Sequence, residues 1–130
     1  MSVPDSQPAN VILVADDDDD MRRLVTFRLE HSGFTVLQAK DGEEAYRLAA
    51  EERPDLAVLD VGMPKLDGVE VVRRLRADAA TQAMPIILLT AWVQEADVQR
   101  GFAAGASDYM KKPFSPMELV ARVQTHLARR

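Results

Sequence analysis

The sequence predicts a single α/β domain, in which five parallel strands form one sheet with helices on both faces. Short apolar runs alternate five times with segments of helical period. The runs are continuously apolar, which is typical of strands that are covered on both sides. The chain has 130 residues, of which 47% are hydrophobic and 28% charged, as in an ordinary globular domain. The prediction is therefore a doubly wound (βα)5 sandwich.

The apolar runs define the strands. We expect them at 11–15, 34–39, 56–59, 85–89 and 107–110. Connections between parallel strands are right-handed, so the helices fall on both faces of the sheet. The strand order that fits best is the flavodoxin-like order 2-1-3-4-5. In that order the first and third strands flank the point where the winding reverses, which is where such folds bind ligands.

Apolar residues at helical spacing mark a helix after each strand. The five stripes are Met21, Leu24, Val25 and Leu29; Ala45, Leu48 and Ala49; Val71, Val72 and Leu75; Val98 and Phe102; and Val120, Val123 and Leu127. Gly33 and Gly105 follow the first and fourth stripes, as expected of helix ends. Ser115 precedes a proline and is expected to cap the fifth helix. We expect Arg73, Arg74 and Arg76 on the solvated face of the third helix.

Composition excludes several classes of function. There is no cysteine, so a disulfide framework or thiolate metal site is impossible. A net charge of -5 argues against direct binding of nucleic acid. No apolar run approaches the roughly 20 residues that cross a bilayer. Residues 1–9 lack the order of a signal peptide, and we expect them to be a flexible leader to a domain over 10–130 in a cytoplasmic protein.

Polar side chains stand where the predicted strands end. Asp16 and Asp17 follow the first strand, Asp60 follows the third, Thr90 the fourth and Lys112 the fifth. Because parallel strands end at the same edge of a sheet, we expect these side chains to gather there. Carboxylates together with one ammonium group suit a divalent metal and a phosphoryl group. Magnesium prefers such hard oxygen ligands, and a carboxylate can accept a phosphoryl group.

Each acid also has a simpler explanation when it is considered alone. Acids before a helix act as caps and interact with the helix dipole, which accounts for Asp18, Asp19 and Asp20. Asp60 and Thr90 could merely close their strands. The dipole explanation does not fit Asp16 and Asp17 well, because they lie at the strand end, where crowded carboxylates repel each other unless a cation is present. The combination of the sites is therefore more informative than any one of them.

Five motifs in the expected order carry a resemblance to a known family. Over about residues 10 to 128, the chain resembles the receiver domains of two-component response regulators, including the chemotaxis receivers. The motifs are Val11-Ile-Leu-Val-Ala-Asp-Asp17, Asp60-Val-Gly-Met-Pro64, Leu66-Asp-Gly68, Leu88-Leu-Thr-Ala91 and Gly105-Ala-Ser-Asp-Tyr-Met-Lys-Lys-Pro-Phe114.

The resemblance implies a role for each site residue. Asp60 would be the phosphoacceptor. Magnesium would be held by Asp17 directly, by Asp16 through water and by the Gly62 carbonyl. Thr90 and Lys112 would contact the phosphoryl group, with a cis bond between Lys112 and Pro113. Tyr109 would be the switch aromatic residue that turns inward when Thr90 moves.

The resemblance also implies partners. A sensor histidine kinase or a histidine phosphotransfer protein would supply the phosphoryl group. The fourth helix, fifth strand and fifth helix would signal to a downstream protein or to an output domain that this sequence lacks. The domain would catalyse only its own phosphorylation and dephosphorylation, at a rate that Gly62 and Trp92 tune. We expect Trp92 to partly roof the pocket.

Two alternatives remain at this point. A phosphohydrolase of the haloacid dehalogenase type also uses an aspartyl phosphate, but generally has a second aspartate where this chain has Gly62. A flavodoxin-like cofactor binder would need glycines and backbone amides in the first turn, where this chain has five aspartates.

Overall fold

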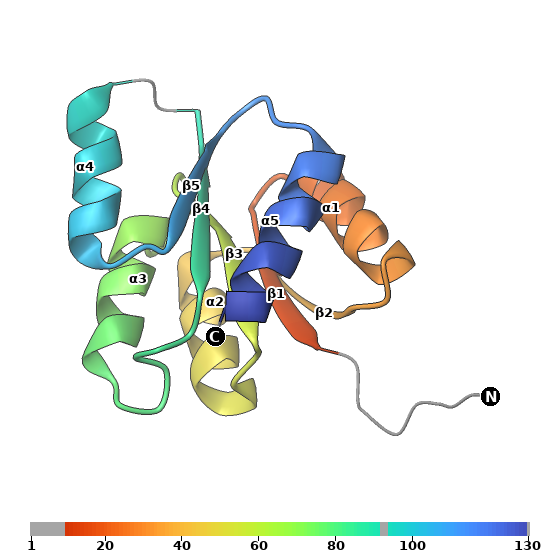
Figure 1. The fold of residues 1–130 in the computed structure, drawn as a ribbon. Coiled ribbons are helices and arrows are strands. Elements are labelled where there is room, and N and C mark those ends of the chain that lie inside the picture. The colour runs from red at the N-terminus through yellow and green to blue at the C-terminus, as the bar shows by residue number, and fades with distance from the viewer. Residues whose placement is uncertain (1–9, 92–93, 130) are drawn as a thin grey trace.

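The computed structural model describes residues 10–91 and 94–129 (Figure 1). The expected leader over 1–9 and the expected roof residue Trp92 lie outside these ranges. Within them, the chain forms a three-layered sandwich, with a central sheet between two layers of helices (Figure 1).

The sheet has the predicted topology. Its five strands are parallel and lie in the order β2-β1-β3-β4-β5. They are β1 (Val11–Ala15), β2 (Thr35–Ala39), β3 (Leu56–Asp60), β4 (Ile86–Thr90) and β5 (Asp108–Lys111). All boundaries agree with the sequence prediction to within one residue.

A helix follows every strand. The helices are α1 (Asp19–His31), α2 (Gly42–Glu52), α3 (Gly68–Ala77), α4 (Glu95–Ala104) and α5 (Pro116–Arg129). α1 and α5 cover one face of the sheet, and α2, α3 and α4 cover the other (Figure 1).

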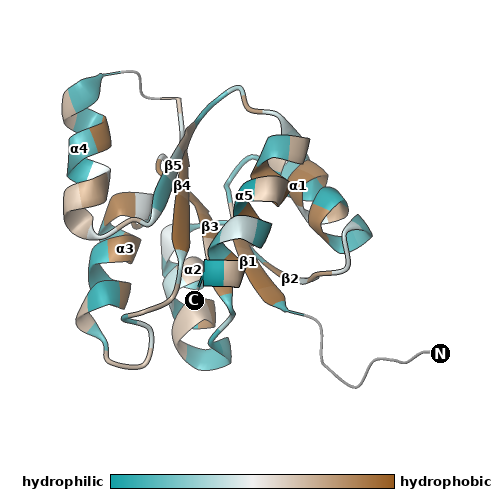
Figure 2. Cartoon of the chain, in the orientation of Figure 1, coloured by the Kyte–Doolittle hydropathy of each residue, from teal (hydrophilic) through white to brown (hydrophobic). Residues whose placement is uncertain are grey.

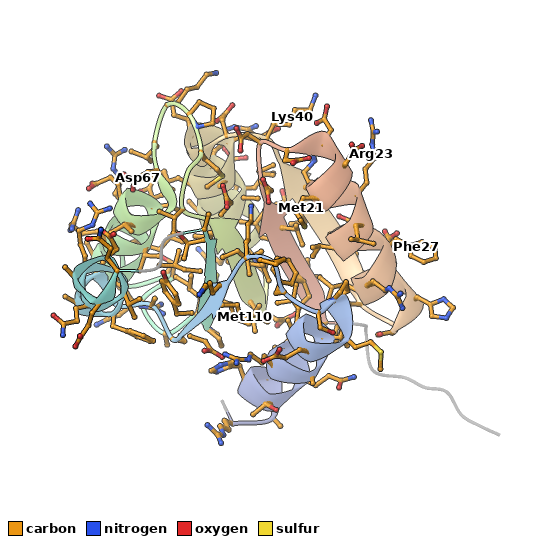
Figure 3. All side chains as sticks on the ribbon, turned by 90° about the horizontal axis from the view of Figure 1, so that it is seen from above. Met21, Arg23, Phe27, Lys40, Asp67 and Met110 are labelled. Atoms are coloured by element: carbon orange, nitrogen blue, oxygen red, sulfur yellow. The ribbon has the colours of Figure 1, made fainter. Side chains whose placement is uncertain are left out.

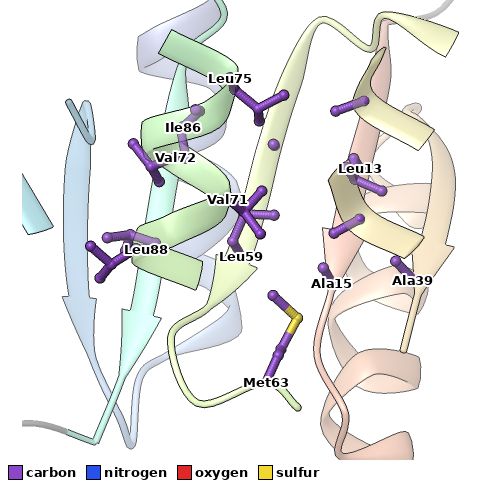
Figure 4. Close-up of a cluster of buried hydrophobic side chains, with 14 of the residues drawn as sticks. Leu13, Ala15, Ala39, Leu59, Met63, Val71, Val72, Leu75, Ile86 and Leu88 are labelled. Atoms are coloured by element: carbon purple, nitrogen blue, oxygen red, sulfur yellow. The ribbon is translucent and has the colours of Figure 1, made fainter. Parts of the chain in front are cut away.

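The sheet separates two apolar clusters, which explains the continuous apolar runs. Leu13, Leu59 and Leu88, from neighbouring strands, belong to one cluster with Val71 and Leu75 of α3 (Figure 4). The alternate strand residues, such as Ile12, Val58 and Ile87, pack instead against α1 and α5. β1 and β4 are accordingly among the most hydrophobic parts of the ribbon (Figure 2). Successive side chains of a strand point to opposite faces, so both sets had to be apolar.

The predicted helix ends are confirmed. Gly33 has φ of 98° and Gly105 has φ of 115°, a backbone conformation that glycine adopts readily. The hydroxyl of Ser115 accepts a hydrogen bond of 3.3 Å from the Glu118 N–H at the start of α5. Asp18 is the N-cap of α1, and its carboxylate accepts from the N–H groups of Asp20 and Met21.

Three side chains differ from what the sequence pattern suggests. Leu24 is 42% exposed and Phe102 is 47% exposed, although both belong to the apolar stripes that mark the helices. The buried face of α1 consists of Arg22, Val25, Thr26 and Leu29. Leu24 lies at the edge of this face and is therefore partly open to solvent. Arg76 is not simply solvated. Its guanidinium donates to the carbonyls of Met84 and Gly105, at 2.6 and 2.8 Å, and so fastens the end of α3 to two loops.

Candidate functional site

The five predicted site residues converge at the carboxyl edge of the sheet, at the upper end in Figure 1. β1 runs into Asp16 and Asp17, while Asp60 and Thr90 are the last residues of β3 and β4. Lys112 follows β5 directly. Figure 3 views the molecule from above, with α1 on one side of the sheet and α3 on the other. The topology alone therefore assembles the site from residues that are far apart in sequence.

Three carboxylates form an acidic cluster. One oxygen from each of Asp16, Asp17 and Asp60 lies within 4.8 Å of the others. Asp16 and Asp60 are buried, with 2% and 7% of their surface exposed, whereas Asp17 is open to solvent. The spacing and the hard oxygen donors are compatible with a single divalent cation. The predicted proximity of Asp17 and Asp60 is confirmed.

The Lys112 ammonium lies against this cluster. Its Nζ is 2.8 Å from Oδ1 of Asp60 and 3.2 Å from Oδ2 of Asp16. Burial by itself would lower the pKa of Lys112, but the Asp60 and Asp16 carboxylates outweigh burial and raise it. The ammonium therefore stays protonated at neutral pH. The bond between Lys112 and Pro113 is cis, as expected.

Asp16 is in a less favourable environment than its ion pair suggests. Burial raises its pKa, and the nearby Asp60 carboxylate raises it further. The Asp18 N–H, at 3.0 Å from Oδ1, and Lys112 act in the opposite direction but do not offset burial. The site thus crowds more negative charge than its lysine balances, which is the condition under which a divalent cation binds well.

Glycines allow other parts of the chain to approach Asp60 closely. The Gly62 N–H donates to Oδ2 of Asp60 at 3.2 Å. At Gly68, the first residue of α3, a Cβ atom would lie 2.5 Å from the Asp60 carbonyl oxygen. The Leu66-Asp-Gly68 motif therefore lets α3 start directly against the end of β3. The sequence analysis used this motif only as a family signature and missed its steric role.

Thr90 and Tyr109 connect the site to the outer strand. Thr90 is 2% exposed, and a hydrogen bond joins its side chain to that of Tyr109. Burial raises the pKa of Tyr109 and this hydrogen bond lowers it, with a net increase. The Tyr109 ring also packs against Phe102 of α4, with the ring centroids 6.3 Å apart. A contact path therefore runs from the carboxyl edge to α4.

Arg22 is a site neighbour that the sequence analysis missed. It is 5% exposed, and its guanidinium donates to the carbonyl of Asp16 at 3.0 Å. The signal was a basic residue two positions after the acidic run, but its buried position could not be predicted from the sequence of α1 alone.

Comparison with known proteins identifies the family. Residues 12–124 match the response regulator receiver domain. The chain belongs to this family. This receiver domain is 50% identical over 118 residues to the alkaline phosphatase synthesis transcriptional regulatory protein PhoP of Bacillus subtilis, covering 91% of this chain and 48% of that protein. It thus spans about half the length of that relative.

Solved structures agree with the family match. CheY4 of Vibrio cholerae aligns with a TM-score of 0.85 and 33% identity, over 90% of this receiver domain and 98% of that chain. The receiver domain of a sensor histidine kinase from Pseudomonas aeruginosa PAO1 aligns with a TM-score of 0.86 and 32% identity, covering 92% and 98% of the two chains. That protein has a magnesium ion coordinated in its active site cleft.

These findings place the receiver domain in two-component signalling. They favour the signalling interpretation over the phosphohydrolase and the flavodoxin-like cofactor binder that the sequence left open. Among the described helices, none combines the length and the apolar character that a bilayer crossing requires.

Proposed function

We propose that Asp60 accepts a phosphoryl group from the phosphohistidine of a sensor histidine kinase or histidine phosphotransfer protein. The observation that best supports this role is the position of Lys112, whose ammonium lies 2.8 Å from Asp60 at the edge of the acidic cluster. A carboxylate that is buried, paired with one ammonium and adjacent to two other carboxylates is suited to phosphoryl chemistry.

In the proposed transfer, an Asp60 oxygen forms a bond to phosphorus while the bond between phosphorus and the histidine nitrogen breaks. The histidine nitrogen keeps the electron pair of that bond. Lys112 then turns from the Asp60 carboxylate to a phosphoryl oxygen, and the Thr90 hydroxyl donates to another. The domain catalyses its own phosphorylation and dephosphorylation and acts on no separate substrate.

Magnesium is the proposed cofactor, and the donor set fits it. Asp17 and Asp60 would bind the ion directly, Asp16 would bind through water, and the Gly62 carbonyl would complete the protein ligands. The bound ion would neutralise charge on the phosphoryl oxygens. The magnesium site in the similar Pseudomonas aeruginosa receiver domain supports this assignment.

The proposed output surface comprises α4, β5 and α5. Phosphorylation would draw Thr90 toward the phosphoryl group and let Tyr109 turn inward, which changes the surface presented to a downstream protein or to an output domain. The contact of Tyr109 with both Thr90 and Phe102 supports this route. By analogy with transcriptional regulatory relatives, the proposed location is the cytoplasm.

Intact mass spectrometry tests the acceptor. After incubation with acetyl phosphate and magnesium, we expect one phosphoryl adduct, which disappears in Asp60→Asn and after chelation of the metal. Asp20→Asn is the matched control, because Asp20 belongs to the same acidic run but is exposed and outside the cluster. A full adduct on Asp60→Asn would place the acceptor elsewhere.

A further inference from the structure

The acidic run supplies five consecutive aspartates, but only Asp16 and Asp17 join the cluster with Asp60. The carboxylate of Asp18 is bound to the first turn of α1 as its N-cap. The carboxylate of Asp19 lies 2.6 Å from a terminal nitrogen of Arg22. The selection of two aspartates therefore depends on contacts around the turn that follows β1.

Arg22 occupies the centre of those contacts. Its three guanidinium nitrogens reach three different parts of the chain. They donate to the Asp16 carbonyl at 3.0 Å, to Oε1 of Gln38 at 3.1 Å and to Oδ1 of Asp19 at 2.6 Å. A buried guanidinium is unfavourable unless such partners satisfy it. Arg23, the next residue, is exposed and lies on the outer side of α1 (Figure 3).

The contact with the Asp16 carbonyl bears directly on Asp17. That carbonyl belongs to the planar peptide unit that joins the two residues, so fixing its direction fixes the orientation of the whole unit. Gln38 is near the end of β2 and pairs in register with Val14 of β1, so it provides a rigid second anchor for the guanidinium. The direction in which the Asp17 side chain leaves the backbone is thereby constrained.

We propose that Arg22 is a positioning residue of the metal site. It orients the peptide unit between Asp16 and Asp17, and it holds the Asp19 carboxylate away from the cluster. Groups that lie behind metal ligands and orient them commonly change metal affinity by about 10- to 100-fold when they are mutated. The proposal rests on the proposed function only in taking the acidic cluster as the magnesium site.

Magnesium titration by calorimetry tests the proposal, because charge and positioning predict opposite results. Loss of a positive charge near a cation site would by itself strengthen magnesium binding. If Arg22 positions the ligands, Arg22→Gln instead weakens binding by about 10-fold. Arg23→Gln removes the same charge from the adjacent, exposed position and should bind magnesium at least as tightly as the wild type.

Arg22→Lys provides a second variant, because it keeps the charge but loses the fork of donors. This variant is also expected to bind magnesium more weakly than the wild type. If Arg22→Gln does not fold, the proposal is tested with Arg22→Lys alone. Thermal unfolding without metal identifies the temperature range in which each variant is folded. Wild-type affinity in both variants, or in Arg22→Lys alone if only that variant folds, would overturn the proposal. Failure of the wild type to bind magnesium would contradict the proposed function itself.

Discussion

The carboxylates of Asp16, which is buried, and Asp108, which is partly buried, have opposite surroundings. Asp16 shares Lys112 with Asp60, and burial raises its pKa. Asp108, at the start of β5, has two basic partners, since Arg122, which also pairs with Glu118, and His126 each lie 2.9 Å from one of its oxygens. Burial would raise the pKa of Asp108, but the hydrogen bond with His126, that with the Tyr109 N–H and the Arg122 charge lower it.

The surroundings of Asp16 suit the binding of a cation, whereas those of Asp108 suit the stabilisation of the fold. At the carboxyl edge, negative charge exceeds the available positive charge and leaves room for a cation. At Asp108 the negative charge is fully matched, and the contact joins β5 to α5. The pKa shifts of the two aspartates have opposite directions for this reason.

The largest expected effect concerns Lys112. Lys112→Met leaves Asp16 and Asp60 buried together without their ammonium. We expect the free energy of unfolding in the absence of metal to fall by about 3 kcal/mol, because unpaired buried charge is strongly unfavourable. Urea denaturation measures it. Lys111→Met, at the exposed neighbouring position, should unfold like the wild type. Equal losses in the two variants would show that the cluster does not depend on Lys112.

Asp108→Asn removes the ion pair with Arg122 and weakens the contact with His126. A loss of about 1.5 kcal/mol is expected at neutral pH, a modest value because the side chain is partly exposed. The folded-state pKa of Asp108 lies below its usual value of 3.8, so its ionisation stabilises the fold above that pH. The difference from the wild type should therefore persist at pH 5 and shrink below about pH 4. A difference that stays constant into strong acid would mean that ionisation of Asp108 contributes nothing.

Asp16→Asn should change the free energy of unfolding in the opposite direction and stabilise the metal-free protein. Because the folded state raises the pKa of Asp16, its ionisation destabilises the metal-free fold, most strongly at neutral pH. We expect a gain of about 1 kcal/mol, together with weaker magnesium binding. The gain should shrink as the pH falls through the raised pKa. Thermal unfolding with and without magnesium separates the two effects, and a less stable metal-free variant would contradict the comparison.

The smallest effect is expected at Tyr109. Tyr109→Phe keeps the packing on Phe102 but loses the hydroxyl that bonds with Thr90. The free energy of unfolding should change by only about 0.5 kcal/mol, because the ring stays in place. Phosphorylation of Asp60 by acetyl phosphate should continue, which mass spectrometry would show. Complete loss of phosphorylation would give Tyr109 a direct part in the transfer.

The sequence predicted the fold well because the three central strands, β1, β3 and β4, are covered on both faces and are therefore almost continuously apolar. The location of the site followed from the same property, since parallel strands bring Asp17, Asp60 and Lys112 to one edge. The burial of Arg22 and the partial burial of Arg76 were not predicted, because a helical pattern treats arginine as a solvated residue. Their partners include backbone carbonyls that only the folded chain brings close. Likewise, the contact of His126 with Asp108, 18 positions away, exists only in the folded chain.

The short distance between Gly68 and the Asp60 carbonyl has a mechanical consequence. A methyl group at that position would meet the carbonyl oxygen at 2.5 Å, so α3 already abuts the backbone of the acceptor residue. The helix thus acts as a fixed stop on one flank of the reaction centre. A movement of Asp60 toward α3 is therefore sterically blocked.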